Sequence, residues 1–363
     1  MRENGFRVLT GTDVHSLLAG QESRLIEIVR EAYEIHCRGG TSVPHSSFLR
    51  FPNDQENRII ALPAYLAGEY CGAGIKWVSS FPGNIDRGLD RASAILILNS
   101  MQTGRPAVIM EGSLISAKRT AASAALAARA LHKDTAVESV GVIGCGVINL
   151  EIQRFLLTQF PSIRKLYLHD LRPERAAEFK RTFMERFQGV HVEIARDIPS
   201  LLRAAPLISL ATTATRPHIA DLSAVSAGAT ILHISLRDLA PEVILTCDNV
   251  ADDIDHVCRE QTSIHLAEQM SGTRGFVRCA LGEITSGRLA ARRDDKSTVV
   301  FSPFGLGVLD IAVGGFVYQR ALEEKKGVEI DSFFPGASLS PALRPPAVKS
   351  HAPVKSASFG EIA

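Results

Sequence analysis

Residues 139–149, which read SVGVIGCGVIN, decide the fold of this chain. A β-branched run from Val140 to Ile143 enters the glycine turn Gly144-Cys145-Gly146, and an apolar-periodic segment follows. This order predicts a buried strand, a tight turn and the start of a helix. The first glycine permits the turn, the second lets the backbone approach a pyrophosphate, and the helix N-terminus offers free N–H groups to phosphates. The residues that we expect at a bound dinucleotide are Gly144, Gly146, Val147 and Ile148.

An acidic residue downstream supports the dinucleotide interpretation. Asp170 ends a second predicted strand, 164–169, and lies 24 positions after Gly146. At that distance a carboxylate can accept hydrogen bonds from the ribose hydroxyls of NAD. The third position of the glycine pattern is Asn149 rather than Gly or Ala, which leaves the packing of helix on strand open at that point. The alternative is an ordinary strand–turn–helix followed by a chance acidic residue.

Strand and helix patterns alternate from residue 139 onward, which predicts a Rossmann-type α/β fold with a doubly wound parallel sheet. The predicted strands are 139–144, 164–169, 190–195, 206–211, 229–235, 248–252 and 297–302. A different, α+β region comes first, with a predicted helix at 13–38 and predicted strands at 58–63, 72–79, 93–98 and 106–111. An alanine-rich helix, 114–131, links the two regions, and a late helix, 307–325, could return to the first.

Composition limits the classes of function. The chain has 363 residues, 45 % of them hydrophobic, which is enough for two domains with sizeable cores. Its formal net charge of +1 implies no nucleic-acid or membrane partner. No apolar run is long enough to span a membrane, and the N-terminus lacks an apolar signal core. The six cysteines form no CxxC pair, so we expect reduced thiols in a cytoplasmic protein.

Cations in the first region form a candidate substrate site, and they are Arg58, Lys76, Arg91 and Arg119. A charged lysine within an apolar strand is costly unless it is paired. As a set, these side chains could bind substrate carboxylates, because Arg suits bidentate binding and Lys can poise or protonate a reacting amine. The alternative is salt bridging with acids such as Glu69 or Glu111.

Polar residues also follow two predicted strands of the parallel sheet. Asp238 follows strand 229–235, and Thr212 and Thr213 follow strand 206–211, at the carboxyl edge where open α/β folds bind ligands. Asp238 could orient water or accept a proton. Position alone favours the alternative, a helix N-cap before Leu239. The threonines could line the cofactor or form a polar loop.

The segment 252–258, which reads DDIDHVC, looks like a metal cluster. No HExxH motif, EF-hand loop or spaced Cys/His set supports a metal there, so we predict none. We expect the acids of this segment to cap the next helix.

Taken together, the motifs resemble the ornithine cyclodeaminase/mu-crystallin family. They are GIKW with Lys76, GRPAVIMEGSLISAKRTAASA with Arg119, GCGVIN, TTAT, Asp238 and FGLGVLD with Asp310, and the resemblance covers roughly residues 5–335. The family fold is an N-terminal substrate and dimerisation domain plus a Rossmann domain. The resemblance implies a homodimer whose chain divides into a substrate-binding and dimerisation domain, 1–123, completed by 308–335, and a Rossmann NAD-binding domain, 124–307. The last segment, 336–363, is rich in Ala, Pro, Ser and Lys with little apolar content, which predicts a disordered tail.

Within the family, the stretches RIIALP, GIKWVSSFPGNIDRGLDRASAILILN and MEGSLIS are most similar to the N-((2S)-2-amino-2-carboxyethyl)-L-glutamate dehydrogenase branch. That branch oxidises the glutamate-side C–N bond of an amino-acid conjugate with NAD. Water then splits the imine into 2-oxoglutarate and L-2,3-diaminopropionate, which serves siderophore or peptide antibiotic biosynthesis. The implied pathway partner is a PLP-dependent synthase that supplies the conjugate.

The resemblance also implies roles for individual residues. Lys76 and Arg119 would bind the substrate carboxylate and poise the amine, Asp238 would direct the water, and Asp310 would lie near the nicotinamide. Ile60 stands where cyclodeaminases carry an acidic residue before Leu-x-Pro, and Arg58 nearby favours an anionic substrate.

Two other functions stay open. One is an ornithine cyclodeaminase or ketimine reductase, which Ile60 and Arg58 disfavour. The other is a non-catalytic, crystallin-like nucleotide-binding protein, which the joint presence of Lys76, Arg119 and Asp238 disfavours.

Overall fold

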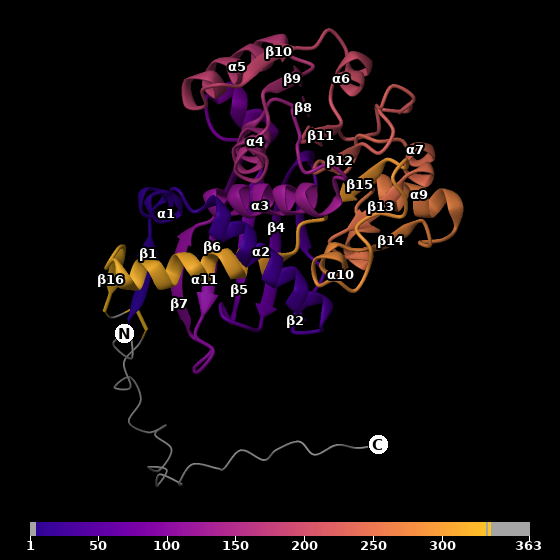
Figure 1. The fold of residues 1–363 in the computed structure, drawn as a ribbon. Coiled ribbons are helices and arrows are strands. Elements are labelled where there is room, and N and C mark those ends of the chain that lie inside the picture. The colour runs from indigo at the N-terminus through magenta and orange to yellow at the C-terminus, as the bar shows by residue number, and fades with distance from the viewer. Residues whose placement is uncertain (1–4, 332, 335–363) are drawn as a thin grey trace, which may run out of the picture.

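Two sheets organise the molecule, a computed structural model that describes residues 5–331, 333 and 334 (Figure 1). One sheet belongs to the N-terminal region, and the other forms a Rossmann-type domain at the top and right of the view. The second sheet confirms the predicted α/β fold. The predicted tail, 336–363, lies outside the described residues.

The first sheet runs in the order β16-β1-β7-β6-β5-β4-β2, and β3 pairs with β4. Its strands are β1 (Phe6–Leu9), β2 (Thr41–Ser42), β3 (Ser47–Phe51), β4 (Asp54–Leu66), β5 (Gly72–Ser80), β6 (Ala92–Asn99), β7 (Pro106–Glu111) and β16 (Val328–Ile330). Strands β4 to β7 pair antiparallel with their neighbours in the chain. Successive side chains therefore point to opposite faces, and Lys76 is buried whereas Trp77 is 39 % exposed.

The second sheet is wholly parallel and has the order β10-β9-β8-β11-β12-β15-β13-β14. Its strands are β8 (Ser139–Ile143), β9 (Lys165–His169), β10 (His191–Ile194), β11 (Leu207–Leu210), β12 (Thr230–His233), β13 (Asp248–Ala251), β14 (Val277–Ala280) and β15 (Val299–Ser302). The strand order reverses between β8 and β11, and folds of this kind bind ligands at such a switch point. The carboxyl ends of β8, β11 and β12 lie side by side there.

Helices cover both sheets and join them. They are α1 (Gly11–Leu18), α2 (Glu22–Cys37), the 3-10 helix η1 (Pro82–Arg87), α3 (Ser113–Leu131), α4 (Val147–Gln159), α5 (Pro173–Arg186), α6 (Ile198–Ala204), α7 (Pro241–Thr246), α8 (Ile254–Val257), α9 (Ser263–Ser271), α10 (Leu281–Thr285) and α11 (Gly307–Glu323). The linking helix α3 packs on α2 and on α4, and the late helix α11 returns to β4, β5 and β6. The domain boundary that we place after residue 123 thus falls inside a continuous helix.

The stretch predicted as helical, 13–38, forms two helices. The segment forms α1 and α2, which are separated at Gly20, where φ is 70° and a helix cannot continue. The predicted strands of the parallel sheet end within two residues of the observed ones, but β14 was not predicted. Strands β1, β2, β3 and β16 were also missed, and each has at most five residues.

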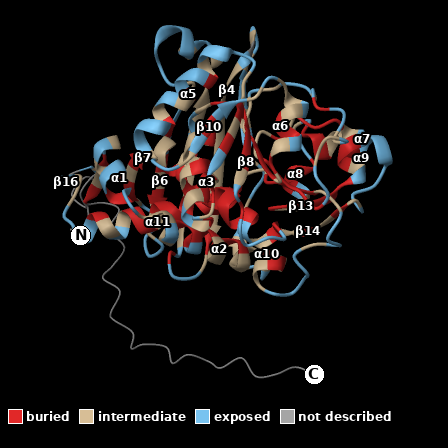
Figure 2. Ribbon diagram, turned by 45° about the horizontal axis from the view of Figure 1, so that its top comes forward, coloured by how far each residue is buried: buried red, intermediate tan, exposed pale blue. Residues whose placement is uncertain are grey.

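Buried residues gather along α3 and around the strands, and the outer helices turn exposed faces to solvent (Figure 2). The alanines of α3 are almost all buried, and their small side chains let α2 and α4 pack closely on either side. Within the described residues, no helix has the length and apolarity that a membrane crossing needs. All six cysteines are free thiols.

Candidate active site

The glycine turn connects β8 to α4 at the switch point of the parallel sheet. Gly144 has a φ of 88°, and a Cβ there would lie 2.5 Å from the Ala211 carbonyl oxygen, so only glycine fits. Gly146 is the N-cap of α4, and a Cβ on it would meet no atom within 4 Å. This open space, together with the free N–H groups of the first turn at Val147 and Ile148, fits a pyrophosphate.

Asn149 stands at the third position of the glycine pattern, where a small residue is usual. Its contacts show how the larger side chain is accommodated. The side chain is fully buried. Its Nδ2 donates to the carbonyl oxygens of Ile143, at 3.0 Å, and Gly144, at 2.7 Å. Its Oδ1 accepts from Ser209 on β11 at 2.6 Å. The amide therefore ties α4 to β8 and β11 by hydrogen bonds, which answers the packing question that the sequence left open.

Asp170 follows β9 and faces the same turn. Its Oδ2 accepts from the backbone N–H of Cys145 at 2.7 Å, and its Oδ1 accepts from that of Arg172 at 2.9 Å. The carboxylate thus lies where a Rossmann fold places the adenosine ribose of NAD. On the opposite side of the turn, Thr212 lies against Gly144, and Thr213 is exposed on the same loop. The set of residues around the turn fits a dinucleotide.

Lys76 and Arg119 meet at one buried carboxylate, that of Asp310. Lys76 Nζ lies 2.8 Å from Asp310 Oδ2, and Arg119 Nε lies 3.2 Å from Asp310 Oδ1. Ser116 Oγ accepts from Lys76 Nζ at 3.1 Å. The three charged residues come from β5, α3 and α11. The alternative of salt bridging with Glu69 or Glu111 does not hold for Lys76, since Glu69 pairs with Arg24 and Glu111 accepts from the first backbone N–H groups of α3.

Burial sets the protonation of Lys76. Removal from water lowers the pKa of its amine to about 8, and the charge of Arg119 lowers it too, whereas Asp310 opposes the shift. An amine with this pKa can take up or release a proton near neutral pH. A loop closes over Arg119 at Gly305, where a Cβ would lie 3.0 Å from Arg119 Nη1. The backbone N–H of Gly305 donates to the buried Asp252 at 2.7 Å, which holds the loop in place.

Asp238 is a fully buried acceptor at the end of β12 and not a helix cap. The N-cap of α7 is Ala240, so the alternative that position alone favoured is wrong. Thr212 and Ser235 donate hydroxyl hydrogen bonds to the two carboxylate oxygens. His218 Nε2 lies 3.0 Å from Oδ1. The preceding turn contains Leu236 with a φ of 69°, a left-handed conformation that is uncommon for a leucine and often found at functional sites.

The electrostatics of Asp238 favour its charged form. Burial alone would raise the pKa of the carboxyl group, but the hydrogen bonds of His218, His233 and Ser235 and the charge of His233 outweigh burial and hold that pKa well below its usual range. Asp238 therefore stays an anion and accepts protons poorly. Its side chain is set up to orient His218, which is partly exposed at the carboxyl edge of the sheet.

Arg58 and Arg91 form a second group of cations. The Nε atoms of both are buried and have no hydrogen-bond partner among the described residues. Burial lowers the pKa of Arg91, and the charge of Arg58 lowers it further. Arg237 belongs to the same group, because burial and then Arg58 lower its pKa. Arg237 donates to the Glu260 carbonyl oxygen at 2.6 Å, whereas the Nε atoms of Arg58 and Arg91 have no such partner among the described residues. Partly buried cations of this kind are suited to bind anions.

Sequence reasoning missed Ser116, His218, Ser235 and Arg237. Ser235 and Arg237 lie just before the predicted Asp238 and follow the same strand, so the argument from the carboxyl end of that strand finds them when it is extended by a few positions. His218 lies in the loop that follows the TTAT motif. Ser116 has no local signal, because its role depends on α3 packing beside β5 and α11.

A model of the ornithine cyclodeaminase/mu-crystallin family matches residues 7–325. The chain is 28 % identical to the N-((2S)-2-amino-2-carboxyethyl)-L-glutamate dehydrogenase of Staphylococcus aureus, over 90 % of this chain and 98 % of that protein. It is 29 % identical to the alanine dehydrogenase of Archaeoglobus fulgidus, over the same shares. A solved archaeal alanine dehydrogenase dimer with bound NAD superimposes with a TM-score of 0.81 at 27 % identity, over 91 % of this chain and 100 % of that chain.

Proposed function

Because the chain belongs to the ornithine cyclodeaminase/mu-crystallin family, we propose that it is a dehydrogenase of N-((2S)-2-amino-2-carboxyethyl)-L-glutamate. The protein is an NAD-dependent oxidoreductase that acts on a CH–NH bond of an amino acid, as its relatives are. The proposed reaction converts the conjugate, NAD and water into 2-oxoglutarate, L-2,3-diaminopropionate and NADH. Its product would serve siderophore or peptide antibiotic biosynthesis.

The observation that carries the choice of substrate is the second group of cations, Arg58, Arg91 and Arg237. All three guanidinium groups are partly buried, and the Nε atoms of Arg58 and Arg91 have no hydrogen-bond partner among the described residues. Such groups favour an anionic ligand, and the proposed substrate has three carboxylates. Ornithine and alanine have one carboxylate each. Position 60 on β4 is an isoleucine, which cannot form an ion pair with the free side-chain amine of ornithine as an acidic residue would.

Strand register supports a long substrate. Lys76 pairs with Leu62 and Ser80 pairs with Arg58, so Lys76 and Arg58 lie on one face of the sheet, four residues apart along β4. That separation corresponds to about 13 Å at a strand rise of about 3.3 Å per residue. One carboxylate can therefore bind near Lys76 and Arg119 while another reaches the second group of cations.

Lys76 is the proposed proton acceptor in the oxidation. The reacting secondary amine must lose a proton before its lone pair can assist departure of a hydride from the neighbouring carbon. Lys76, with its lowered pKa, can take that proton in its neutral form, while Arg119 holds the carboxylate of the same amino acid and Asp310 positions both side chains. When bound, NAD supplies the hydride acceptor.

We assign the cofactor to the glycine turn. The pyrophosphate would be held by Gly144, Gly146, Val147 and Ile148. Asp170 would bind the ribose, and Thr212 and Thr213 would line the cofactor from the loop opposite the turn. In this assignment Asp310 lies near the reacting amine and away from the phosphates, which agrees with the expectation that it lies near the nicotinamide.

Hydrolysis of the imine needs a directed water. Asp238 would hold His218 through Nε2, which leaves Nδ1 of His218 to accept a proton from that water. The oxygen adds to the imine carbon, the C–N bond breaks, and the amine leaves as L-2,3-diaminopropionate. In this assignment Asp238 directs the water through the imidazole.

The proposal extends to the assembly and its setting. We propose a homodimer, because the apolar outer face of the first sheet exposes Trp77 and its cross-strand neighbour Ile95. A PLP-dependent synthase would supply the conjugate. A cytoplasmic location is part of the proposal, since free thiols such as these are usual in a reducing compartment.

A substrate comparison tests the proposal. Purified protein and NAD are mixed with the conjugate, ornithine, lysine or alanine, and NADH formation is followed. We expect kcat/KM for the conjugate to exceed the others by at least tenfold, because each carboxylate–arginine hydrogen bond contributes about 1.5–3 kcal/mol. Arg91→Gln should raise KM for the conjugate, and the exposed Arg196→Gln serves as the matched control. A preference for ornithine, lysine or alanine would overturn the assignment.

A further inference from the structure

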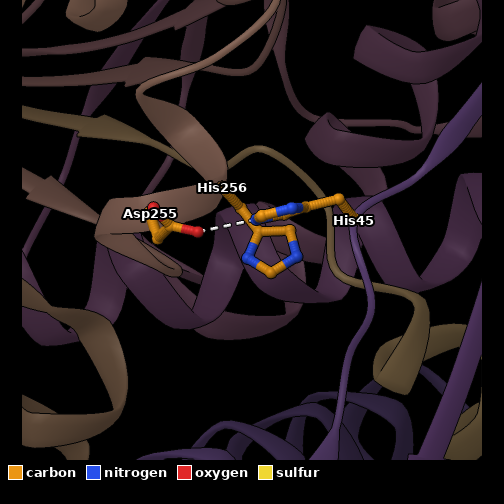
Figure 3. Close-up of side chains that lie close together, drawn as sticks. All are labelled: His45, Asp255 and His256. Carbon is orange, nitrogen blue, oxygen red and sulfur yellow. Dashed lines mark hydrogen bonds and ion pairs between the residues drawn. The ribbon is translucent and has the colours of Figure 1, made fainter.

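Three potential metal ligands from distant parts of the chain meet at the boundary between the two sheets. His45 lies between β2 and β3, whereas Asp255 and His256 lie on α8. Each offers one ligand atom, and these atoms lie within 4.8 Å of one another. In Figure 3, Asp255 and His45 point toward one another beside the His256 ring. The three residues are called the His45 cluster below.

His256 is oriented like a metal ligand. Its Nδ1 lies 3.0 Å from Asp253 Oδ1, and its Nε2 is buried without a hydrogen-bond partner among the described residues. The side chain is 9 % exposed. Metal-binding histidines commonly donate one ring N–H to a carboxylate and bind the metal with the other nitrogen. Asp253 is itself held by His36, at 3.0 Å, and it caps α8, as the sequence predicted for this acidic segment.

The other two members also have supporting contacts. Asp255 Oδ2 lies 2.6 Å from His45 Nε2, and Asp255 Oδ1 accepts from Arg274 at 3.1 Å. Arg259 Nη1 lies 2.9 Å and 3.0 Å from the two ring nitrogens of His45. Arg259 therefore occupies the space beside both ring nitrogens, and a metal ion can bind His45 only when the guanidinium moves away. Arg259 is exposed and can move aside.

The segment 252–258 alone predicts no metal, but the fold adds His45 to it. We propose that the His45 cluster binds a zinc-class divalent cation that joins the two sheets. Two imidazoles and one carboxylate suit Zn²⁺, and three protein ligands leave a fourth position for water or another ligand. His45 and Asp255 are exposed, which gives the ion a path of entry. The carboxylates of Asp253 and Asp255 offset the nearby arginines.

The position of the cluster connects it to the active site. The His256 ring lies 6.2 Å from the Phe304 ring, and the Phe304 N–H donates to Asp252 at 2.8 Å. The next residue, Gly305, packs on Arg119. An ion at the cluster would therefore hold His45 against the domain that carries the loop over Arg119.

Metal titration of the full-length protein, stripped with a chelator, tests the proposal. Zn²⁺ is added and binding is measured by calorimetry, and Co²⁺ is added as a spectroscopic probe whose visible absorption reports tetrahedral coordination. We expect one ion per chain and a rise in the unfolding midpoint with Zn²⁺. Asp253→Asn keeps the helix cap and should weaken binding by about 10–100-fold. His45→Ala, on an exposed loop, should weaken it by more.

Two further variants separate specific from adventitious binding. His265→Ala, a histidine of α9 outside the cluster, should leave Zn²⁺ affinity unchanged. Arg259→Gln should strengthen binding, because it removes a cation beside the ion. Absence of stoichiometric Zn²⁺ binding, or an affinity insensitive to both His45→Ala and Asp253→Asn, would overturn the proposal and leave His45 and Asp255 as a hydrogen-bonded pair between the two sheets.

Discussion

Lys76 shows how neighbours decide the chemistry of a single residue. Its Nζ is buried between Asp310 and Ser116, and the lost hydration lowers the pKa of the amine to about 8. A solvated lysine has a pKa of about 10.4 and would be fully charged at the pH of most cells. Burial of the Lys76 amine therefore costs stability, but it provides an amine that exchanges protons near neutral pH.

The pH dependence of the reaction should report Lys76. If its neutral form accepts the substrate proton, kcat/KM should rise with pH through about 8, because that profile reflects the free enzyme. Lys76→Met should lower the rate and remove this transition. Asp310→Asn should move the transition to lower pH, because Asp310 raises the pKa of Lys76. A transition near 8 that persists in Lys76→Met would assign it to another group.

The same residue affects stability in a defined direction. Because the pKa of Lys76 is lower in the folded chain than in the unfolded chain, the unfolded chain binds more protons between about pH 8 and 10. This contribution makes the free energy of unfolding increase as pH rises through that window. Lys76→Met should flatten the increase, which denaturant titrations at several pH values would measure.

Asp238 and His218 can be separated by paired substitutions. Asp238→Asn should lower kcat by about 10²–10⁴, the usual worth of general acid–base catalysis, since it removes the anion that orients His218. It should also cost about 1–3 kcal/mol of stability, because an amide nitrogen would face the hydroxyl donors of Thr212 and Ser235. Turnover and the unfolding midpoint are measured on one preparation.

His218→Gln distinguishes the two possible proton acceptors. If His218 accepts the proton from water, this variant should lose as much turnover as Asp238→Asn but little stability, because His218 is partly exposed. Full turnover in His218→Gln, together with a loss in Asp238→Asn, would make Asp238 itself the base. Near-normal turnover in both variants would remove the pair from the mechanism.

At the scale of elements, the turn between β8 and α4 depends on a polar contact where related patterns use a small residue. Asn149→Ala should lower the free energy of unfolding by about 1–3 kcal/mol, because Ser209 and two carbonyl oxygens lose their partner in a buried place. KM for NAD should rise as the turn loosens. Chemical denaturation and initial rates at varied NAD would measure both.

A double variant tests whether the loss of stability in Asn149→Ala comes from the hydrogen bond between Asn149 and Ser209. Ser209→Ala removes the donor to Asn149, so the double variant Asn149→Ala with Ser209→Ala should lose less stability than the sum of the single variants. Strict additivity would show that the two residues act independently. The cofactor turn would then be held by its glycines alone.

At the scale of the whole molecule, the outer face of the first sheet should hold the dimer together. Trp77 pairs across strands with Ile95, and the two are 39 % and 38 % exposed. Trp77→Asp places a charge in that face and should yield monomers in light scattering after size-exclusion chromatography. Trp77→Phe should stay dimeric, and Leu171→Asp, at an exposed residue of the other domain, is the matched control. A dimeric Trp77→Asp would place the interface elsewhere.

Local patterns in the sequence were sufficient to predict the fold class and most strands of the parallel sheet. The glycine turn, the β-branched run before it and the spacing to Asp170 depend on residues close in the chain, and they identified β8, α4 and β9 in their order. Alternating strands and helices then imply a parallel sheet, because parallel neighbours need crossover connections. Short strands such as β1 and β3 carry too few residues to show a period, and they were missed.

The sequence by itself therefore determined the doubly wound sheet, the place of the glycine turn and the residue types available for chemistry. Only the tertiary structure decided which of those residues meet. Lys76 and Asp310 are 234 positions apart, and His45 and Asp255 are 210 positions apart. Such pairs form when α11 and α8 pack against elements from the start of the chain. Nothing in local spacing encodes that contact, because burial selects the partner only after the elements have assembled.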